Sequence, residues 1–472
     1  MVRRDTGIWV LGLTSAAGFM VALDQLVVAT ALTTVQRELH ASLATLEWTV
    51  NAYGMAFAVL LMIGSSLGDR YGRRRVLVSG VSLFTLASVG CAVAPNVGLL
   101  IAARTVQGAG SALVMPAAMA LLSAAYPAAR RGRALGIFTA LTGFAVVCGP
   151  LVGGAVTAGL GWQWIFWLNV PLGLAVVPLV RARVAESFGP RHRLDLVGCA
   201  LATAALLDVV WGLIRGGAAG WSAPETYGAL ATSVPLFAAF IWWERRVDEP
   251  MLPLGMWRSA AFTAGSAASF LLYAVVTGSV FFLSQFLQAS LRLSPIGAGL
   301  RMMPWTAAVL VVAPLSGKLV DRIGARRPLV VGLTMQAGGL VWIAYETHRG
   351  GGYASFVVAL AVAGVGVTMA MPAVQSAVFN GVAQADVGKA SGTFNTVRQL
   401  GGVFGVAVLS AVFAAGGSYS SEATFRQGLA PALATAAALS LAGALVGGAT
   451  RRAAPAPIVV DMRPAAAGAR AD

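Results

Sequence analysis

Long apolar segments separated by short polar stretches constrain the fold of this 472-residue chain more than any other feature. Each is long enough to cross a hydrocarbon core about 30 Å thick, which takes about 20 helical residues. Because backbone groups in lipid must be satisfied within the segment itself, we expect helices rather than strands. We assign fourteen spans, at 8–32, 45–68, 76–94, 98–124, 134–158, 164–182, 195–214, 226–243, 260–288, 296–319, 328–345, 353–379, 390–415 and 429–449.

The composition agrees with an all-α polytopic membrane protein. Apolar residues make up 58% of the chain and charged residues only 11%, whereas soluble domains carry about 25% charged residues. Three cysteines lie inside apolar runs and three histidines lie far apart, so we expect no disulfide framework and no metal site. The chain also lacks paired carboxylates or a histidine box within the membrane, so the sequence does not predict an enzyme, and no catalytic residue is assigned.

The basic residues orient the spans. If the amino terminus is cytoplasmic, 25 of the 33 Lys and Arg residues fall in cytoplasmic segments, 5 outside and 3 within spans. This bias follows the positive-inside rule, which also explains the net charge of +15 without a nucleic-acid partner. An even number of spans places both termini in the cytoplasm. The tail at 451–472 is rich in Ala and Pro and is expected to be disordered.

Two loops repeat within the chain. The first reads LGDRYGRRR from Leu67, and the second reads GKLVDRIGARR from Gly317, which places Asp69 and Asp321 252 residues apart. Internal repeats of this kind are typical of transporters. The spacing predicts a six-helix bundle at 1–182, a two-helix insert with cytoplasmic linkers at 183–258, and a second six-helix bundle at 259–450.

These loops resemble the loop motif of the major facilitator superfamily, although Ser65 stands where the first loop's leading Gly is expected. Other stretches are similar to the fourteen-helix drug:proton antiporter branch, although Thr33 stands where the first-span motif usually ends in Pro. These stretches are LDQLVVATAL (23–32), RTVQGAG (104–110), GPLVGG (149–154), WQWIFWLNVPLG (162–173) and SGTFNTVRQLGG (391–402).

The resemblance implies a major facilitator fold with two inserted helices, and a function in exporting lipophilic drugs or antibiotics across the plasma membrane. It implies alternating access driven by the proton gradient, with no cofactor. No GxxxxGK[ST] loop is present, so ATP is not expected to drive transport. A specific metabolite or nutrient carrier of the same superfamily is the alternative. A monomer in the bilayer is the working expectation.

Ionisable residues inside spans are the candidate functional residues, because such groups are costly in lipid. The resemblance assigns Asp24 and Arg104 to proton coupling; the alternatives are a structural hydrogen bond and an arginine bound to backbone carbonyls. Gln107 lies on the same helix face as Arg104. Asn395 and Arg398 share a polar stripe that either lines the central cavity or packs against a neighbouring helix.

The remaining candidates are loop and glycine motifs. The resemblance implies a cytoplasmic charge latch, whereas a purely topogenic basic loop would not explain its aspartates and glycines. The latch residues are Asp69, Arg70, Gly72, Arg73, Asp321, Arg322 and Gly324. The antiporter motif comprises Gly149, Pro150, Gly153 and Gly154, and removes bulk so that helices can approach closely.

Asp24 is the only carboxylate that we place in the core of the two six-helix units, and it suggests a limit on substrate charge. We assume that one proton enters for each substrate that leaves. Moving one charge through 100 mV is worth about 2.3 kcal/mol, and one pH unit about 1.4 kcal/mol. Export of a neutral substrate is driven by the membrane potential and the pH gradient together, and export of a monocation by the pH gradient alone. Export of a dication is opposed by the membrane potential. We therefore expect neutral or monocationic lipophilic substrates.

Overall fold

The computed structural model describes residues 4–189, 195–248, 250, 254–382 and 387–449, and this part of the chain is helical without strands. The tail expected to be disordered lies outside the described residues. The first nine helices are α1 (Arg4–Glu38), α2 (Leu43–Tyr71), α3 (Arg73–Ala92), α4 (Val97–Ala125), α5 (Ala128–Gly159), α6 (Trp164–Trp167), α7 (Asn169–Arg183), α8 (Leu196–Ala219) and α9 (Pro224–Glu244). After the 3₁₀ turn η1 (Leu254–Arg258), the others are α10 (Ala260–Ala289), α11 (Pro295–Thr306), α12 (Ala308–Ile323), α13 (Arg326–His348), α14 (Tyr353–Phe379), α15 (Val387–Ala414) and α16 (Glu422–Gly448).

Thirteen helical segments in the described chain are long and apolar enough to cross a membrane. The bent helix α2, whose parts Thr45–Leu61 and Ile63–Tyr71 meet at 48°, raises the number to 14 when it is taken as one span. Helices α6 and α7 together make one span, as do α11 and the start of α12. The predicted all-α polytopic architecture is therefore confirmed.

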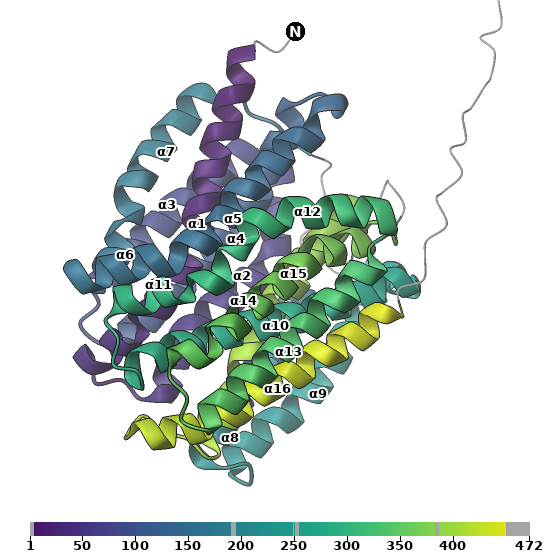
Figure 1. The fold of residues 1–472 in the computed structure, drawn as a ribbon. Coiled ribbons are helices and arrows are strands. Elements are labelled where there is room, and N and C mark those ends of the chain that lie inside the picture. Colours follow the sequence, from purple (N-terminus) through teal and green to yellow (C-terminus); the bar gives the residue numbers. More distant parts are fainter. Residues whose placement is uncertain (1–3, 190–194, 249, 251–253, 383–386, 450–472) are drawn as a thin grey trace, which may run out of the picture.

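The same helix pairings occur twice along the chain. In residues 4–183, α1 packs on α5 and α3 on α4; in residues 260–448, α10 packs on α15 and α13 on α14. Figure 1 shows the first set in purple and blue, and the second in green and yellow. This recurrence is what a duplicated six-helix unit would give, while the exact boundaries of the three segments stay a prediction.

The inserted helices α8 and α9 pair with each other, and α8 also contacts α2 and α15. From the sequence, Asp208 could pair with Arg215 along α8 or face a neighbouring helix. The structure shows the second: Arg215 forms an ion pair with Glu225 at 2.5 Å, and the Asp208 carboxylate accepts a hydrogen bond from Thr232 on α9 at 2.7 Å. Both charged side chains of α8 thus bind α9, Arg215 at its first turn and Asp208 further along. These contacts hold the two inserted helices together.

The ends of the helices define two faces of the bundle. We call the end where α1 begins and α16 ends the terminal face, and the opposite end, where α1 ends and α2 begins, the distal face. Several helices that begin at the distal face have a side-chain cap, which satisfies amide groups that the first helical turn leaves free. These caps are Ser42, Asn96, Ser294 and Ser421.

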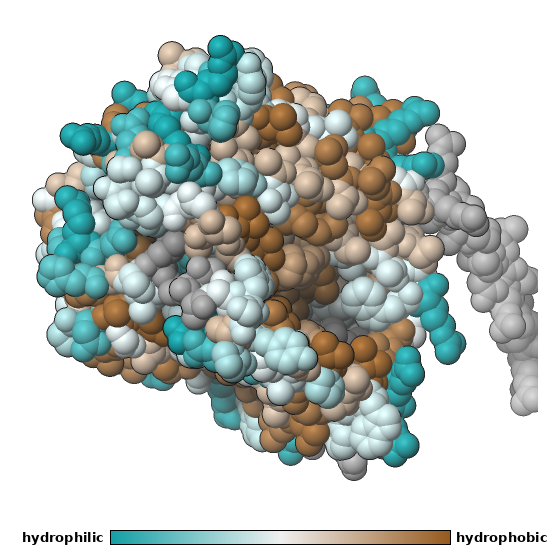
Figure 2. All heavy atoms as spheres, turned by 90° about the horizontal axis from the view of Figure 1, so that it is seen from below, coloured by the Kyte–Doolittle hydropathy of each residue, from teal (hydrophilic) through white to brown (hydrophobic). Residues whose placement is uncertain are grey.

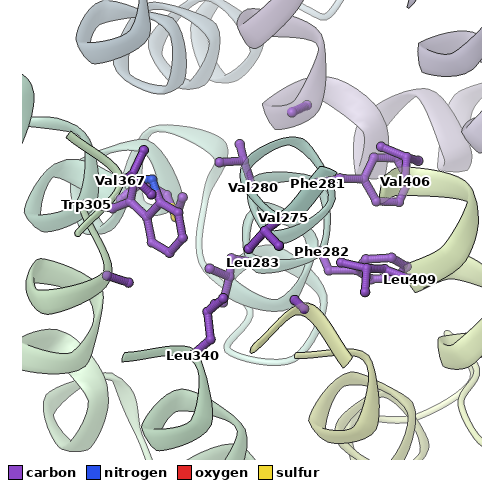
Figure 3. Close-up of a cluster of buried hydrophobic side chains, with 14 of the residues drawn as sticks. Val275, Val280, Phe281, Phe282, Leu283, Trp305, Leu340, Val367, Val406 and Leu409 are labelled. Carbon is purple, nitrogen blue, oxygen red and sulfur yellow. The ribbon is translucent and has the colours of Figure 1, made fainter. Parts of the chain in front are cut away.

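The largest apolar core surrounds α10. Phe281 and Phe282 of α10 point toward Val406 and Leu409 of α15 (Figure 3). The Phe282 ring lies 5.0 Å from that of Phe413, measured between centroids. This core of uncharged side chains holds α10 against the helices around it. Polar side chains at its edge therefore stand out from their surroundings.

The outer surface is also apolar. Large side chains stand exposed on helices from every part of the chain, including Leu86 (70% exposed) on α3 and Leu445 (78%) on α16. Figure 2 shows hydrophobic side chains spread across one face, with hydrophilic groups mainly toward its edges. Exposed apolar surface on this scale is unfavourable in water and natural in lipid.

Candidate proton-coupling site

The Asp24 carboxylate lies at the centre of a buried polar network. The side chain of Asp24 is 1% exposed, and its Oδ2 lies 2.5 Å from Nη1 of Arg104 on α4. Its Oδ1 accepts hydrogen bonds from Gln107 on α4 and Asn169 on α7, both at 2.9 Å. The structure therefore joins two residues that the sequence singled out separately, and it places a third candidate, Gln107, on both of them.

The Arg104 guanidinium is held on several sides. Its Nη1 also donates to Gln107 Oε1 at 2.6 Å, and its Nε donates to the Thr49 carbonyl of α2 at 3.1 Å. Its Cζ lies 4.1 Å from the centroid of the Tyr53 ring, a cation–π contact. Arg104 is thus bound both to a carboxylate and to a backbone carbonyl, while its role in proton coupling stays a prediction.

A glycine brings α2 and α4 close enough for these contacts. A Cβ added to Gly108 would lie 3.0 Å from the Tyr53 carbonyl carbon and nearer still to its oxygen. The Tyr53 hydroxyl shares a hydrogen bond of 2.8 Å with Ser111, one helical turn beyond Gln107. The face of α4 that carries Arg104 and Gln107 is therefore turned toward α2 and the Asp24 network.

The network suits an ionised Asp24. A carboxylate only accepts hydrogen bonds, and each polar group bound to Asp24 donates one. Removing one partner from a buried ion pair is costly because it leaves the other charge uncompensated. Asp24 and Arg104 therefore depend on each other for their burial between α1 and α4.

Two members of the network were not predicted from the sequence. Asn169 binds Asp24, and Ser88 of α3 accepts hydrogen bonds from Gln107 at 2.8 Å and Asn169 at 3.3 Å. Asn169 belongs to the WQWIFWLNVPLG stretch, and a polar residue within an apolar span already indicates a candidate functional residue. Ser88 carries no such signal, because small hydroxyl residues occur throughout these helices.

The first copy of the loop motif forms ion pairs and hydrogen bonds within the first half of the chain. Asp69 binds Arg73 through Nε at 2.9 Å and Nη2 at 2.7 Å. The Arg73 amide donates to the Ser187 carbonyl at 2.9 Å, and Arg70 lies over the Tyr71 ring. The motif thus connects the α2–α3 turn to the segment after α7.

Glu186 was not predicted from the sequence, yet it caps this turn. Its carboxylate accepts a hydrogen bond from the Arg74 amide at 2.8 Å and lies within 3.9 Å of the Arg75 guanidinium. Gly72 has a φ of 108°, and an added Cβ would lie 2.7 Å from the Glu186 carboxyl carbon. The glycine is therefore needed for both its backbone conformation and its space.

The second copy repeats the turn. Gly324 ends α12 with a φ of 81°, and its amide donates to the Val320 carbonyl at 2.9 Å. Arg322 is exposed, and the side chain of Asp321 lies outside the described part of the structure. The two copies therefore share a glycine turn, while the described ion pair belongs to the first.

The GPxxGG stretch of α5 lies against two helices. Added Cβ atoms would meet Leu26 from Gly149, Val27 and Thr30 from Gly153, and Pro295 from Gly154. The Pro150 carbonyl lies in turn against Gly299 of α11. The four residues thus let α5 approach α1 and α11 closely, as expected of small residues at a helix interface.

Arg398 and Asn395 lie apart from the Asp24 network. Arg398 lies 5.2 Å over the Tyr273 ring of α10, and Asn395 donates to the Ser391 carbonyl at 2.9 Å. None of these described contacts is with the Asp24 network, and the choice between cavity lining and helix packing stays open for both residues.

One expectation was wrong. Asp24 is not the only carboxylate inside the six-helix units, because Glu47 of α2 is also buried, at 3% exposure. The residue falls within the predicted second span but near its end, where a carboxylate is usually solvated. Sequence position alone did not reveal that α15 covers it.

Similar solved structures share the fold alone. A POT family transporter in complex with a thioalcohol-conjugated peptide is 14% identical, with a TM-score of 0.69 over 92% of this chain and 94% of that one. The xylose transporter XylE from E. coli is 14% identical, with a TM-score of 0.64 over 93% and 98%.

Curated relatives are closer in sequence. The multidrug resistance protein Stp of Mycobacterium tuberculosis is 38% identical over 84% of this chain and 74% of its own. The tetracenomycin C resistance and export protein of Streptomyces glaucescens is 35% identical over 86% and 76%, and the methylenomycin A resistance protein of Streptomyces coelicolor 33% over 87% and 86%. The sequence pattern of the Major Facilitator Superfamily matches residues 14–406. The chain belongs to the Major Facilitator Superfamily.

Proposed function

We propose that this protein exports lipophilic drugs or antibiotics in exchange for protons across the plasma membrane. The distal face is then outside and both termini are cytoplasmic. The observation that carries the proposal is the buried Asp24–Arg104 pair, a titratable group placed among spanning helices of a family that includes resistance and export proteins.

Contacts between the two halves on the distal face support alternating access. Thr33 at the end of α1 donates to Gln288 of α10 at 2.6 Å, and Ser284 donates to the Ala29 carbonyl at 3.1 Å. Helix α5 meets α11 through Gly154 and Pro295. These contacts close the distal face while Asp24 is bound by Arg104.

The proposed cycle follows from this pairing. When the distal face opens, a proton from outside binds Asp24 and weakens its bond to Arg104. Return to the distal-closed state and release of that proton to the cytoplasm restore the ion pair. Substrate leaves the cell in the opposite movement, when the distal face opens. The proton gradient therefore drives export with no bound cofactor or ATP.

The substrates we propose are neutral or monocationic and lipophilic. When one proton enters through Asp24 for each substrate that leaves, the membrane potential and the pH gradient favour export of a neutral substrate, and the pH gradient favours export of a monocation. The names of the relatives favour export over the alternative of a nutrient carrier.

The decisive experiment measures dye efflux from cells that express the protein, with and without a protonophore. We expect a lipophilic monocationic dye to leave faster than from control cells, and the protonophore to remove the difference. Efflux that persists without a proton gradient would contradict the proposal.

The orientation predicts which loops can be labelled from outside. In a chain whose native cysteines are replaced, Ser222→Cys lies in the exposed turn between α8 and α9, and Ala185→Cys lies after α7. We expect an impermeant maleimide to label position 222 in intact cells and position 185 only after permeabilisation. The reverse pattern would overturn the proposed topology.

The latch predicts slow turnover with intact binding. Asp69→Asn removes the charge that binds Arg73 at the terminal face, away from the Asp24 network. We expect efflux to slow several-fold while equilibrium binding of a radiolabelled substrate is retained. Loss of binding with normal turnover in Asp69→Asn would rule out a latch.

A further inference from the structure

Glu47 is a buried carboxyl group that the proposed coupling mechanism does not use. It lies in the first turns of α2, near the distal face, and is 3% exposed. Its neighbour Trp48 packs against Trp211 of α8, with 5.9 Å between ring centroids. Glu47 therefore lies within the packed bundle and not on its wet surface.

The groups that face Glu47 come from the second half of the chain. The Ser410 hydroxyl of α15 lies beside its carboxyl group, and the Tyr419 phenol lies close enough to interact electrostatically with it. Tyr419 is fixed by a hydrogen bond to Gln285 of α10, and its ring packs 5.0 Å from that of Phe425. Glu47 thus lies where α2 meets the second half, among uncharged groups.

Within the described part of the chain no cation pairs with Glu47. Of the charged groups on the helices beside α2, Arg104 pairs with Asp24, Arg215 with Glu225, Asp208 with Thr232 and Arg398 with the Tyr273 ring, while Arg37 at the end of α1 is exposed. A carboxylate buried without a cation is strongly disfavoured, and such a group stays neutral instead. The closed arrangement of these helices therefore suits a protonated Glu47.

The same contact helps to close the distal face. Two turns along α2, an added Cβ at Gly54 would lie 2.6 Å from Val403 of α15. Met55 packs with Val403 and Ala407 in one apolar cluster. Separation of α2 from α15 would break this cluster and admit water to Glu47, where its ionised form is no longer penalised.

We propose that Glu47 is a second proton-binding group of this transporter, and that its protonation is required to close the distal face. The assignment of that face to the outside rests on the proposed function. Glu47 takes a proton from outside when α2 meets α15 and returns it to the same side when they separate. It therefore adds a dependence on external pH without adding to the number of protons moved per cycle.

The test measures closure directly in purified protein in lipid nanodiscs, without transport. Spin labels at Leu160→Cys and Ala415→Cys, both exposed at the distal face, report the distance between the halves in a background free of native cysteines. We expect the closed fraction to fall as pH rises from 5 to 9, by up to about tenfold in the closed-to-open ratio per pH unit. The variant Glu47→Gln is expected to lose this fall with rising pH and to keep only the opposite effect of Asp24, whose protonation favours opening.

Two further variants make the result specific. Glu38→Gln changes a carboxylate at the distal end of α1 that binds Trp162 and is expected to keep the wild-type response. Glu47→Met, also neutral and of similar length, replaces Glu47→Gln if the amide does not fold. An unchanged pH response in the folded neutral variant, or no response in the wild type, would overturn the proposal. A Glu47-dependent response in a protein that exports no dye would instead refute the proposed function alone.

Discussion

Asp24→Asn is expected to reduce proton-driven dye efflux to that of cells without the transporter. The amide keeps the size of the side chain but can neither ionise nor take up a proton. It also leaves Arg104 without its carboxylate, and breaking a buried ion pair in this way costs about 3–5 kcal/mol. Substrate accumulation in everted vesicles and the coupled release of protons from their lumen are measured, with thermal stability of the purified variant recorded alongside.

A second substitution separates loss of coupling from loss of folding. In Asp24→Asn/Arg104→Gln both charges are absent, so stability is expected to recover relative to the single variant, while proton-driven efflux stays absent. Such non-additivity is the signature of residues in direct contact. Glu38→Gln, on the same helix, is expected to transport normally. Normal efflux by Asp24→Asn would remove this residue from the mechanism.

The fold could be predicted from the sequence because lipid leaves few options. A span must be helical and long, so apolar runs indicate the helices directly, and repeated loop motifs indicate the duplication. The bend in α2 and the breaks between α6 and α7 and between α11 and α12 could not be placed in this way. They depend on how each helix packs against its neighbours, and no local pattern specifies that.

The candidate site was predicted in part. Asp24, Arg104 and Gln107 are polar residues in apolar spans, which makes them visible in sequence. Their mutual contact was not predicted, because the relative rotation of α1 and α4 is a tertiary property. Glu47 shows the limit most clearly: its place near the end of a span looks solvated, and only the packing of α15 over it makes it buried.

Thr33 illustrates how a departure from a family pattern can acquire a role. It stands where the first-span motif usually has Pro, and its hydroxyl bonds Gln288 across the two halves. Proline has no side-chain donor and could not make this bond. The closed distal face of this chain therefore includes a contact that the motif itself does not supply.

Gly154→Ala is expected to disrupt closure of the distal face and reduce efflux strongly. A Cβ at this position would lie 2.7 Å from the carbonyl carbon of Pro295 and 2.8 Å from Cα of Ile296. Both are backbone atoms, so α11 must move as a whole to make room. Overpacking of this kind costs about 1–3 kcal/mol, which corresponds to a shift of about 5- to 150-fold in the equilibrium between states.

The same helix provides a matched control. At Gly143 an added Cβ meets nothing within 4 Å, and alanine favours a helix over glycine by about 1 kcal/mol. Gly143→Ala is therefore expected to transport normally, whereas Gly154→Ala is expected to show a longer distance between spin labels at positions 160 and 415. Gly299→Ala, which presses on Pro150 from the other side of the contact, is expected to behave like Gly154→Ala. If both variants close as the wild type does, the α5–α11 contact does not control the distal face.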